Sequence, residues 1–417
     1  MPGHPSGTTS RRVTTSKRVV STSHLRRPVK LEEPEVEAVG RIAKKRRTSS
    51  VGPDDADQPR QGRSSLEESA LAKETAAIEE VKWEDLDKED EGDPLMVSEY
   101  VVDIFQYLLQ LEQQTMPNPN YIDTQRDLAW KMRGILMDWL IQVHGRFRLL
   151  PETLFLAVNI VDRFLSARTV SLVRLQLVGI TAIFIAAKYE EIMAPSLHNF
   201  IYCSDSTYEE KDIIEAEKYI LKSLDWNLSY PNPIHFLRRA SKADNYDLQV
   251  RTVAKYLIEI SCVDWRLLPY PPSAIAAAGM WLARLILEKE EWTPNLEHYS
   301  GYSEEALLPG AQIMLAYLLR AVRHESFYKK YAAKKYMKVS AYVRDWAWAK
   351  FGAHEVDYDE EGEALTGIEP HKNIVPQPAS ITLFDVLPRL REEARLRKEA
   401  EKAAEDELGV LHEEDEE

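Results

Sequence analysis

Residues 175–187 read LQLVGITAIFIAA, an uncharged stretch with small residues at Gly179, Ala182, Ala186 and Ala187. A helix that is apolar on every face has to be enclosed by other helices, and small side chains let those neighbours approach closely. At 13 residues, the stretch is shorter than the ~20 needed to span a bilayer. It therefore predicts the buried central helix of an all-helical domain in a soluble, intracellular protein.

Amphipathic helices are predicted on both sides of this stretch. Upstream, apolar residues recur at the i, i+3, i+4, i+7 spacing of one helix face, at Met132, Ile135, Leu136, Trp139, Leu140 and Val143. A second helix follows over residues 154–165. Downstream, a helix reaches Leu224 before Pro231 and Pro233 break the chain. Together these elements predict a first domain over residues 128–229.

The same order of elements recurs in the second half of the chain. Residues 251–268 form another amphipathic pattern, prolines follow, and residues 273–287 are a second apolar run with small residues at its centre. The recurrence predicts a second helical domain of similar size over residues 230–350. Within residues 95–127, one more helix is predicted from apolar residues at helical spacing, at Val97, Val101, Ile104, Leu108 and Leu111.

The two ends of the 417-residue chain differ in composition from its middle. Residues 1–93 are rich in Ser, Thr and Pro and then acidic, so they bury too little apolar surface to offset their ordering entropy and are predicted to be disordered. Residues 351–417 are predicted to form an acidic, mostly disordered tail, with helical composition over residues 389–407. The net charge of −15 argues against direct binding to nucleic acid.

The sequence lacks the residue patterns of common enzyme active sites. It has no glycine-rich phosphate loop, no G-x-S-x-G and no H-E-x-x-H, and its ten histidines are scattered. Two cysteines are too few for a disulfide scaffold or a thiolate zinc site. Helical enzymes of the isoprenoid type need Asp-rich metal motifs, whereas the Asp cluster here, at residues 54–57, lies in the leader. We therefore expect a non-catalytic protein that works by binding, without metal or cofactor.

Several ordered motifs resemble the signatures of the cyclin family, namely residues 132–140 (MRGILMDWL), 159–165 (NIVDRFL), 175–179 (LQLVG) and 187–192 (AKYEEI). Residues 230–242 (YPNPIHFLRRASK) resemble B-type, or mitotic, cyclins in particular, and the whole most resembles the fungal ones. The similarity covers roughly residues 95–350. It implies an all-α fold of two tandem five-helix cyclin boxes.

This resemblance implies a regulatory subunit that binds and activates a cyclin-dependent protein kinase, docks its substrates, and drives the G2/M transition and mitosis. ATP and magnesium then belong to the kinase. Lys188 and Glu217 are implied as polar anchors of the kinase-binding face, with further contacts from Tyr189, Glu190, Trp226 and Leu228. In an anonymous helical protein, the alternative is a lysine lying along the surface and a solvated glutamate.

The resemblance also implies that one helix face is exposed as a shallow groove for R-x-L-type substrate or inhibitor peptides. The face carries Met132, Ile135, Leu136 and Trp139, flanked by Gln142 and Gln176. Periodicity alone favours a core role for these apolar residues, so the resemblance reverses the interpretation. Gly134 departs from many relatives, which have Ala, and glycine costs a helix about 1 kcal/mol.

Arg133 and Asp162 match positions that cyclins keep as an internal ion pair, so their implied role is architectural. A candidate phosphate pocket is predicted on the second domain. It comprises Arg251 and Lys255, which share a helix face, and Arg239 from the preceding basic run. The alternative is a solvated basic face.

The leader contains two short motifs of regulatory interest. Lys44, Lys45, Arg46 and Arg47 predict nuclear import, so we expect the protein in the nucleus and cytoplasm. Arg63 and Leu66 match the R-x-x-L degradation signal that mitotic cyclins carry, although no Asn follows within the leader. Recognition by the ubiquitin-ligase degradation machinery is therefore expected from the family and weakly supported by these residues.

Two other functions fit the sequence less well. A cyclin-fold adaptor acting in transcription, without activating a kinase, needs a basic face beyond the one at residues 238–255. Lys188 and Glu217 would also have no purpose in such an adaptor. An orphan helical enzyme lacks metal and nucleophile motifs, and a membrane protein is not expected.

Overall fold

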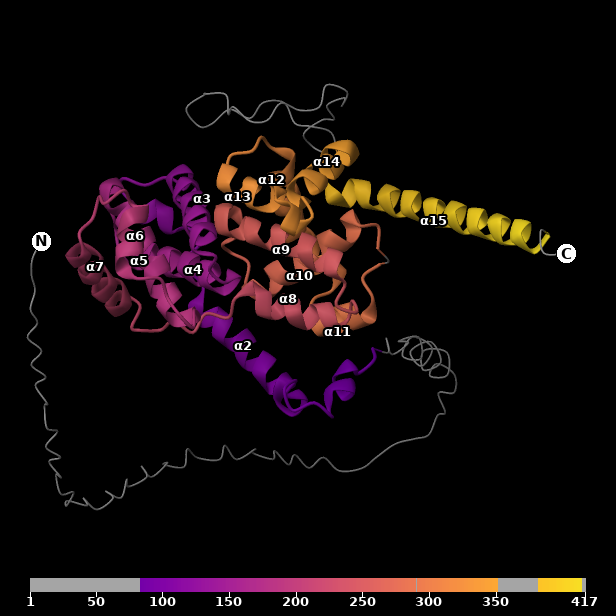
Figure 1. The fold of residues 1–417 in the computed structure, drawn as a ribbon, viewed down its shortest axis with the longest axis horizontal. Coiled ribbons are helices and arrows are strands. Elements are labelled where there is room, and N and C mark those ends of the chain that lie inside the picture. The colour runs from indigo at the N-terminus through magenta and orange to yellow at the C-terminus, as the bar shows by residue number, and fades with distance from the viewer. Residues whose placement is uncertain (1–82, 290, 352–381, 415–417) are drawn as a thin grey trace, which may run out of the picture. The chain divides into compact units, whose positions relative to one another are not determined.

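The computed structural model describes residues 83–289, 291–351 and 382–414. Within these ranges the chain is helical and contains no β-strand. Helices α3–α7 form one domain and helices α8–α14 a second, as predicted, and α2 precedes both (Figure 1). The nuclear-import run at residues 44–47 and the R-x-x-L motif at residues 63–66 lie outside the described residues.

In the first domain, four helices pack around α5 (Leu172–Glu190), the helix predicted to be buried. They are α3 (Trp130–Phe147), α4 (Pro151–Ala167), α6 (Leu197–Cys203) and α7 (Glu210–Ser223). By length and composition alone α5 could cross a membrane, but 61% of its most apolar 18-residue window is buried in the protein, as in a core helix. Gly179 lets α3 approach closely, because a Cβ there would lie 2.7 Å from Cδ1 of Leu136.

The second domain repeats this plan around the apolar helix α10 (Pro272–Ile286). The other long helices are α8 (Pro233–Lys242), α9 (Leu248–Val263), α12 (Glu304–Leu319) and α14 (Val339–Phe351). Shorter elements complete it, namely η4 (Trp265–Leu267), α11 (Pro294–Ser300), α13 (Glu325–Ala332) and η5 (Lys334–Tyr336). Helix α10 contacts α8, α9, α11 and α12, so it occupies the position that α5 has in the first domain.

Residues 83–93, which were predicted to belong to a disordered leader, have a defined conformation. We call residues 83–93 the acidic strap. It contains η1 (Leu86–Asp90), whose N-cap Asp85 accepts a hydrogen bond from the Asp87 amide. The indole ring of Trp83 stacks on His298 of α11, with ring centroids 3.5 Å apart. Aromatic and charged contacts hold this segment, whereas the disorder prediction rested on composition and on the lack of apolar periodicity.

After the strap, η2 (Ser98–Tyr100) leads into α2 (Val101–Thr115), which ends before Pro117. The C-terminal end of α2 is tied to both domains. The Glu112 carboxylate accepts hydrogen bonds from the amide and hydroxyl of Ser273 in α10, at 2.9 and 2.7 Å. Nδ2 of Asn159 in α4 donates to the Thr115 carbonyl at 2.8 Å.

The two domains meet where α3 packs against α9 and α13. Asp138 of α3 accepts hydrogen bonds from the amides of Ser326 and Phe327, at 3.1 and 2.9 Å. These amides lie in the first turn of α13, where a helix leaves N–H groups unpaired and favours negative charge. A first-domain carboxylate thus caps a second-domain helix.

Gly134 of α3 lies directly against His324, the residue that precedes α13. A Cβ at position 134 would be 2.8 Å from Nε2 of His324. The imidazole is held by a 2.9 Å hydrogen bond with the Tyr317 hydroxyl and stacks on that ring. The glycine at this position therefore makes room for a side chain of the second domain.

A buried ion pair joins α3 to α4, as the resemblance implied. Nε and Nη2 of Arg133 donate to the two carboxylate oxygens of Asp162, each at 2.8 Å, and both side chains are 2% exposed. Tyr121 of η3 (Tyr121–Thr124) donates a third hydrogen bond to Asp162, at 2.9 Å. Burial and the negative charge of Asp162 raise the pKa of Tyr121, so its hydroxyl keeps the proton that it donates.

Helix α15 (Leu383–Glu414) departs from the mostly disordered tail predicted for residues 351–417. Its first turns bury four apolar side chains, at Leu383, Val386, Leu387 and Leu390. The Leu383 amide also donates a 2.7 Å hydrogen bond to the side chain of Gln312 in α12. This short apolar stripe anchors the start of the helix on the second domain, and Figure 1 shows the later turns extending beyond it.

Asp162→Asn is expected to lower the free energy of unfolding by about 3–5 kcal/mol, because it leaves the buried charge of Arg133 without its partner. Urea unfolding of the full chain, followed by circular dichroism, measures this loss. Asp123→Asn is the matched control, since Asp123 is exposed in the neighbouring η3. A loss no larger than that of the control would contradict the architectural role of the pair.

Candidate functional site

Lys188 and Glu217 are brought together at the C-terminal end of α5. The ammonium group of Lys188 forms an ion pair with the carboxylate of Glu217 on α7. The same Nζ lies 4.1 Å from the centre of the Phe184 ring. The two side chains are 42% and 15% exposed, so the pair is accessible while its geometry is fixed from two sides. Lys188 is thus held by a partner rather than lying free along the surface.

Exposed apolar side chains continue from this pair into the loop after α5. The ring of Tyr189 is exposed, and Ile192 and Met193 project almost fully into solvent. Burial, together with repulsion from nearby carboxylates, raises the pKa of Glu190. Ile192 and Met193 were not predicted as site residues. The available signal was an uncharged Ile-Met pair between a helix end and Pro195, with no periodic place in the core.

Trp226 and Leu228 lie in the connection that follows α7. Trp226 has a φ of 60°, in the left-handed region that non-glycine residues seldom occupy. Its indole is 67% exposed. Leu228 is half-buried and packs against the core. Trp226 is therefore available to a partner, whereas Leu228 serves mainly in packing.

The face of α3 that was predicted to dock peptides is partly open to solvent. Ile135 is 63% exposed. Leu136, by contrast, is buried and packs against Gly179 of α5. We call the exposed and half-buried residues the α3 docking face: Met132, Ile135, Trp139 and Gln142, with Gln176 of α5. Leu136 packs beneath this face. The residues predicted to dock peptides therefore divide into accessible residues and one buried residue that supports them.

Three cations of the second domain gather near Glu152 of the first. Arg238 of α8 forms an ion pair with Glu152, while Arg251 and Lys255 lie one turn apart on α9. Burial, followed by repulsion from Arg251 and Arg238, lowers the pKa of Lys255, which reflects how close these charges are. Arg238 is exposed and the other two are half-buried. We call Arg238, Arg251 and Lys255 the basic cluster.

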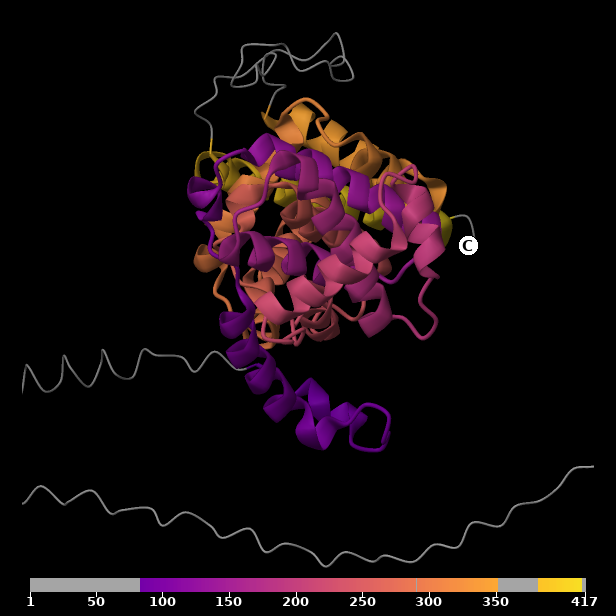
Figure 2. The same cartoon turned by 90° about the vertical axis from the view of Figure 1, so that its left-hand side faces the viewer.

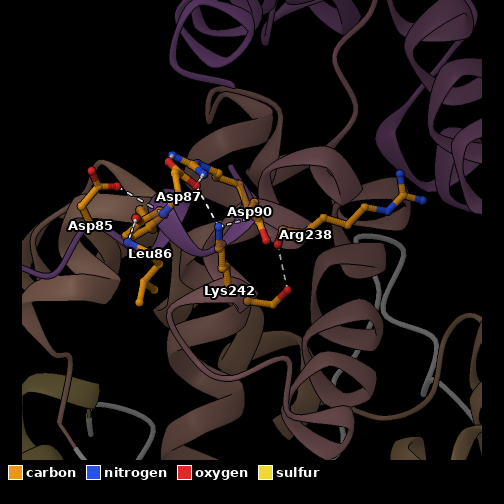
Figure 3. A network of polar contacts seen from close by, with 9 residues as sticks. Asp85, Leu86, Asp87, Asp90, Arg238 and Lys242 are labelled. Atoms are coloured by element: carbon orange, nitrogen blue, oxygen red, sulfur yellow. Dashed lines mark hydrogen bonds and ion pairs between the residues drawn. The ribbon is translucent and has the colours of Figure 1, made fainter. Parts of the chain in front are cut away.

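Arg239 does not belong to the basic cluster, contrary to the prediction. Its guanidinium donates two hydrogen bonds to the carboxylate of Asp87 in the acidic strap, at 2.5 and 2.6 Å. Figure 3 shows Arg238 pointing away from the network of Asp87, Asp90 and Lys242. Successive residues of a helix are about 100° apart around its axis, so two adjacent arginines face different sides. The sequence marked the basic run without showing which arginine faces α9.

A further exposed apolar face lies on α2 and the turn before it. Tyr100, Ile104 and Tyr107 share one side of the helix and are all exposed. In the perpendicular view of Figure 2, α2 projects from the packed helices. The apolar side predicted from the sequence included both Ile104 and Leu108. Leu108 packs against the core, as does Phe105, whereas Ile104 is exposed.

No group of three or more His, Cys, Asp or Glu side chains in the described parts of the chain could hold a metal ion. Both cysteines are free thiols, and Cys262 is buried. What these surfaces offer is apolar area, paired charges and one cluster of cations, which are means of binding another macromolecule.

Comparison with known families matches two domain models in tandem. Residues 103–229 match the cyclin N-terminal domain, and residues 231–345 match the cyclin C-terminal domain. The junction of the two matches falls between α7 and α8, where the structure also passes from its first domain to its second. Together the two matches span more than half of the chain.

Curated relatives include the G2/mitotic-specific cyclin cdc13 of Schizosaccharomyces pombe, which is 64% identical over 264 residues, covering 63% of this chain and 55% of that protein. The G2/mitotic-specific cyclin-B of Emericella nidulans is 61% identical over 263 residues, with the same two coverages. The chain thus spans about half the length of these relatives. Among solved structures, a viral cyclin from herpesvirus saimiri is 20% identical with a TM-score of 0.48, covering 54% of this chain and 99% of that one.

Proposed function

Because the chain belongs to the cyclin family, we propose that it is a regulatory subunit that binds and activates a cyclin-dependent protein kinase and so drives the G2/M transition and mitosis. The relatives named above are G2/mitotic-specific cyclins, which supports this proposal and gives no support to an adaptor acting in transcription. The observation that carries the proposal is the accessible Lys188–Glu217 pair at the end of the buried helix α5.

The proposed mechanism is one of position. A protein kinase needs a Lys–Glu ion pair and a metal-binding Asp in place, and the position of one mobile kinase helix controls the first of these. Four helices enclose α5, so the surface at its end is rigid. A rigid surface that binds the inward position of the kinase helix shifts the kinase toward its active form. The chain contributes no catalytic group, and the kinase binds ATP and magnesium.

The surface around the Lys188–Glu217 pair supplies apolar contact area and also fixes the orientation of the bound partner. Tyr189, Ile192 and Met193 offer exposed apolar contacts beside Lys188, and Trp226 adds an exposed indole. The paired charges of Lys188 and Glu217 fix the orientation of the partner more than they add affinity. A stable interface of this kind buries on the order of 2,000 Å² or more in total.

Replacing both anchors, Lys188→Ala with Glu217→Ala, is expected to weaken binding of a purified cyclin-dependent kinase about tenfold or more, because the charged contacts at the centre of the interface are lost. Calorimetric titration measures the affinity, and a histone phosphorylation assay measures activation.

The matched control for this test is Lys211→Ala with Glu215→Ala. These two residues form another lysine–glutamate pair on α7, at 3.8 Å and largely exposed. The control is expected to bind and activate the kinase like the unmodified chain. Equal binding and activation by the Lys188/Glu217 variant would remove the observation on which the proposed function rests.

We propose that the α3 docking face binds R-x-L-type peptides from substrates or inhibitors. The exposed Ile135 and the half-buried Met132 and Trp139 form an apolar strip for a leucine side chain. The side-chain amides of Gln142 and Gln176 can both donate to and accept from a peptide backbone. Docking here raises the effective concentration of a substrate at the kinase without changing its chemistry.

Ile135→Ala is expected to weaken an R-x-L peptide about three- to tenfold by removing apolar contact area. Fluorescence anisotropy with a labelled peptide measures this on the kinase complex, where phosphorylation of a short substrate without R-x-L should be unchanged. Leu248→Ala, another exposed apolar residue but on α9, is the control. Unchanged R-x-L affinity in Ile135→Ala would place the docking site elsewhere.

We propose that the basic cluster binds phosphorylated segments of partner proteins. Arg238, Arg251 and Lys255 repel one another, with Glu152 as a nearby carboxylate. A phosphate group would relieve this repulsion and accept charge-assisted hydrogen bonds from all three side chains. It would also raise the lowered pKa of Lys255, because a nearby anion favours the protonated amine.

Arg251→Ala with Lys255→Ala is expected to weaken a phosphopeptide about tenfold or more, because hydrogen bonds to charged groups are among the stronger ones. The same peptide without phosphate measures the background. Arg239→Lys is the informative control, since it keeps a cation opposite Asp87 and that side chain should not contribute. Loss of affinity in Arg239→Lys, with none in the double variant, would reverse the assignment.

We further propose that the protein is present in nucleus and cytoplasm, on the basis of Lys44, Lys45, Arg46 and Arg47. Recognition by the ubiquitin-ligase degradation machinery is proposed through Arg63 and Leu66. Both motifs lie outside the described residues.

A further inference from the structure

The acidic strap, residues 83–93, is bound to the second domain through two cations of α8. Asp87 accepts the two hydrogen bonds from Arg239 and a third from Nζ of Lys242, at 3.0 Å. Asp90 accepts another from Lys242, at 2.5 Å. In Figure 3, Asp87 and Asp90 converge on the ammonium group of Lys242. The strap thus neutralises the two cations of α8 that the basic cluster does not use.

Polar and aromatic contacts with α11 secure the same segment. The Leu86 amide donates to the Tyr299 hydroxyl at 2.7 Å, and the Glu84 amide donates to Oδ1 of Asn295 at 2.8 Å. Trp83 stacks on His298. The contacts of the strap therefore cover several residues in succession, as expected of a docked peptide.

The cations beneath the strap are largely removed from solvent. The Arg239 side chain is 12% exposed and that of Lys242 is 8% exposed. Taking away one member of a buried pair leaves an uncompensated charge, which is strongly unfavourable. The interaction favours the ionised strap: burial acts to raise the pKa of Asp87, but hydrogen bonds from Arg239 and Lys242 outweigh it and hold the pKa below its usual value.

Arg239 connects the strap to α2. While it binds Asp87, its guanidinium lies 5.4 Å from the centre of the Phe105 ring on α2 and 4.5 Å from that of Tyr299 on α11. Phe105 in turn meets Phe236 of α8 edge to face. A cation above an aromatic ring is attracted to it. One guanidinium therefore holds the strap, α2 and α11 together.

We propose that the acidic strap is a positioning element: through Asp87 and Arg239 it fixes the N-terminal half of α2 on the second domain, and the kinase binds with α2 already in that place. Glu112 and Thr115 fix the other end of the helix. Tyr100, Ile104 and Tyr107 nevertheless remain exposed on the attached helix and the turn before it. Residues from 103 onward belong to the matched cyclin N-terminal domain, so most of α2 is part of the family's common unit rather than of the leader.

The proposal concerning the kinase rests on the proposed function, whereas the attachment of α2 can be tested without a partner. In the full chain, Asp87→Asn with Asp90→Asn is expected to speed amide hydrogen exchange over residues 101–108 at least tenfold. Affinity for the kinase is expected to fall about tenfold, because a loosened α2 has to be ordered again on binding. Hydrogen-exchange mass spectrometry and calorimetric titration measure the two effects.

Glu89→Gln with Glu91→Gln is the matched control, since it removes the same charge from exposed positions of the strap. Trp83→Ala is the second variant. It removes the ring stacking on His298 without leaving an unpaired buried charge, and it is expected to speed exchange in the same residues. Thermal unfolding of every variant shows whether the second domain as a whole has been affected.

Exchange in α2 that matches the control in both variants would overturn the proposal. Faster exchange with unchanged kinase affinity would overturn the claim that α2 is positioned for the kinase. If the unmodified chain does not bind a cyclin-dependent kinase, the proposed function fails, and the exchange comparison still decides whether the strap holds α2.

Acidification provides an independent readout of the strap. A carboxylate whose pKa is lowered in the folded state contributes stability above its ordinary titration range and loses it as the pH falls through the folded value. The strap should therefore detach in acid below the usual range for aspartate. The fluorescence difference between the unmodified chain and Trp83→Phe follows this step. Asp90, which binds Lys242, and His298, which stacks on Trp83, also face the strap, and burial lowers the pKa of His298. Asp87→Asn should therefore change the midpoint and the size of the acid step, and an identical step in Asp87→Asn would contradict the role of Asp87.

Discussion

The enclosure of α5 is the constraint on which the surfaces of the first domain depend. Every residue from Val178 to Ala187 is buried, and exposing so much apolar surface costs about 25 cal/mol for each Å². Helices α3, α4, α6 and α7 therefore have to cover it. Lys188 is the first charged residue after the apolar run, so it marks the point where the helix leaves the core. Helix α7, drawn in to cover α5, brings Glu217 to that point.

The helices and their grouping into two tandem domains could be predicted from the sequence because they follow from periodicity and from prolines. The burial of α5 could be predicted without reference to a family, because an uncharged apolar run with small residues is typical of a helix enclosed by other helices. The roles of Lys188, Glu217 and the α3 docking face were different, because spacing alone favoured solvent or core for them. The resemblance to cyclins supplied those assignments, and the structure shows the first two paired and most of that face accessible.

The misplaced features share a physical cause, which is that they depend on contacts between distant segments. Which of Arg238 and Arg239 belongs to the basic cluster depends on the side of α8 that each residue faces. The strap occupies the side that carries Arg239. The strap itself has no apolar repeat, and charges and one indole hold it. The start of α15 is similar, because four apolar side chains in a charged helix suffice when α12 offers a surface for them.

The contact between Gly134 and His324 has a consequence for the relation between the two domains. A methyl group at one position and an imidazole at the other would claim the same volume, so the identities of these residues are coupled across nearly two hundred positions of chain. The imidazole also lies against the backbone of α3, the helix that carries the docking face. Any hinge motion that brought the two domains closer at this contact would press the His324 ring into the backbone of α3. The contact therefore opposes any rotation of the two boxes that presses α3 against His324.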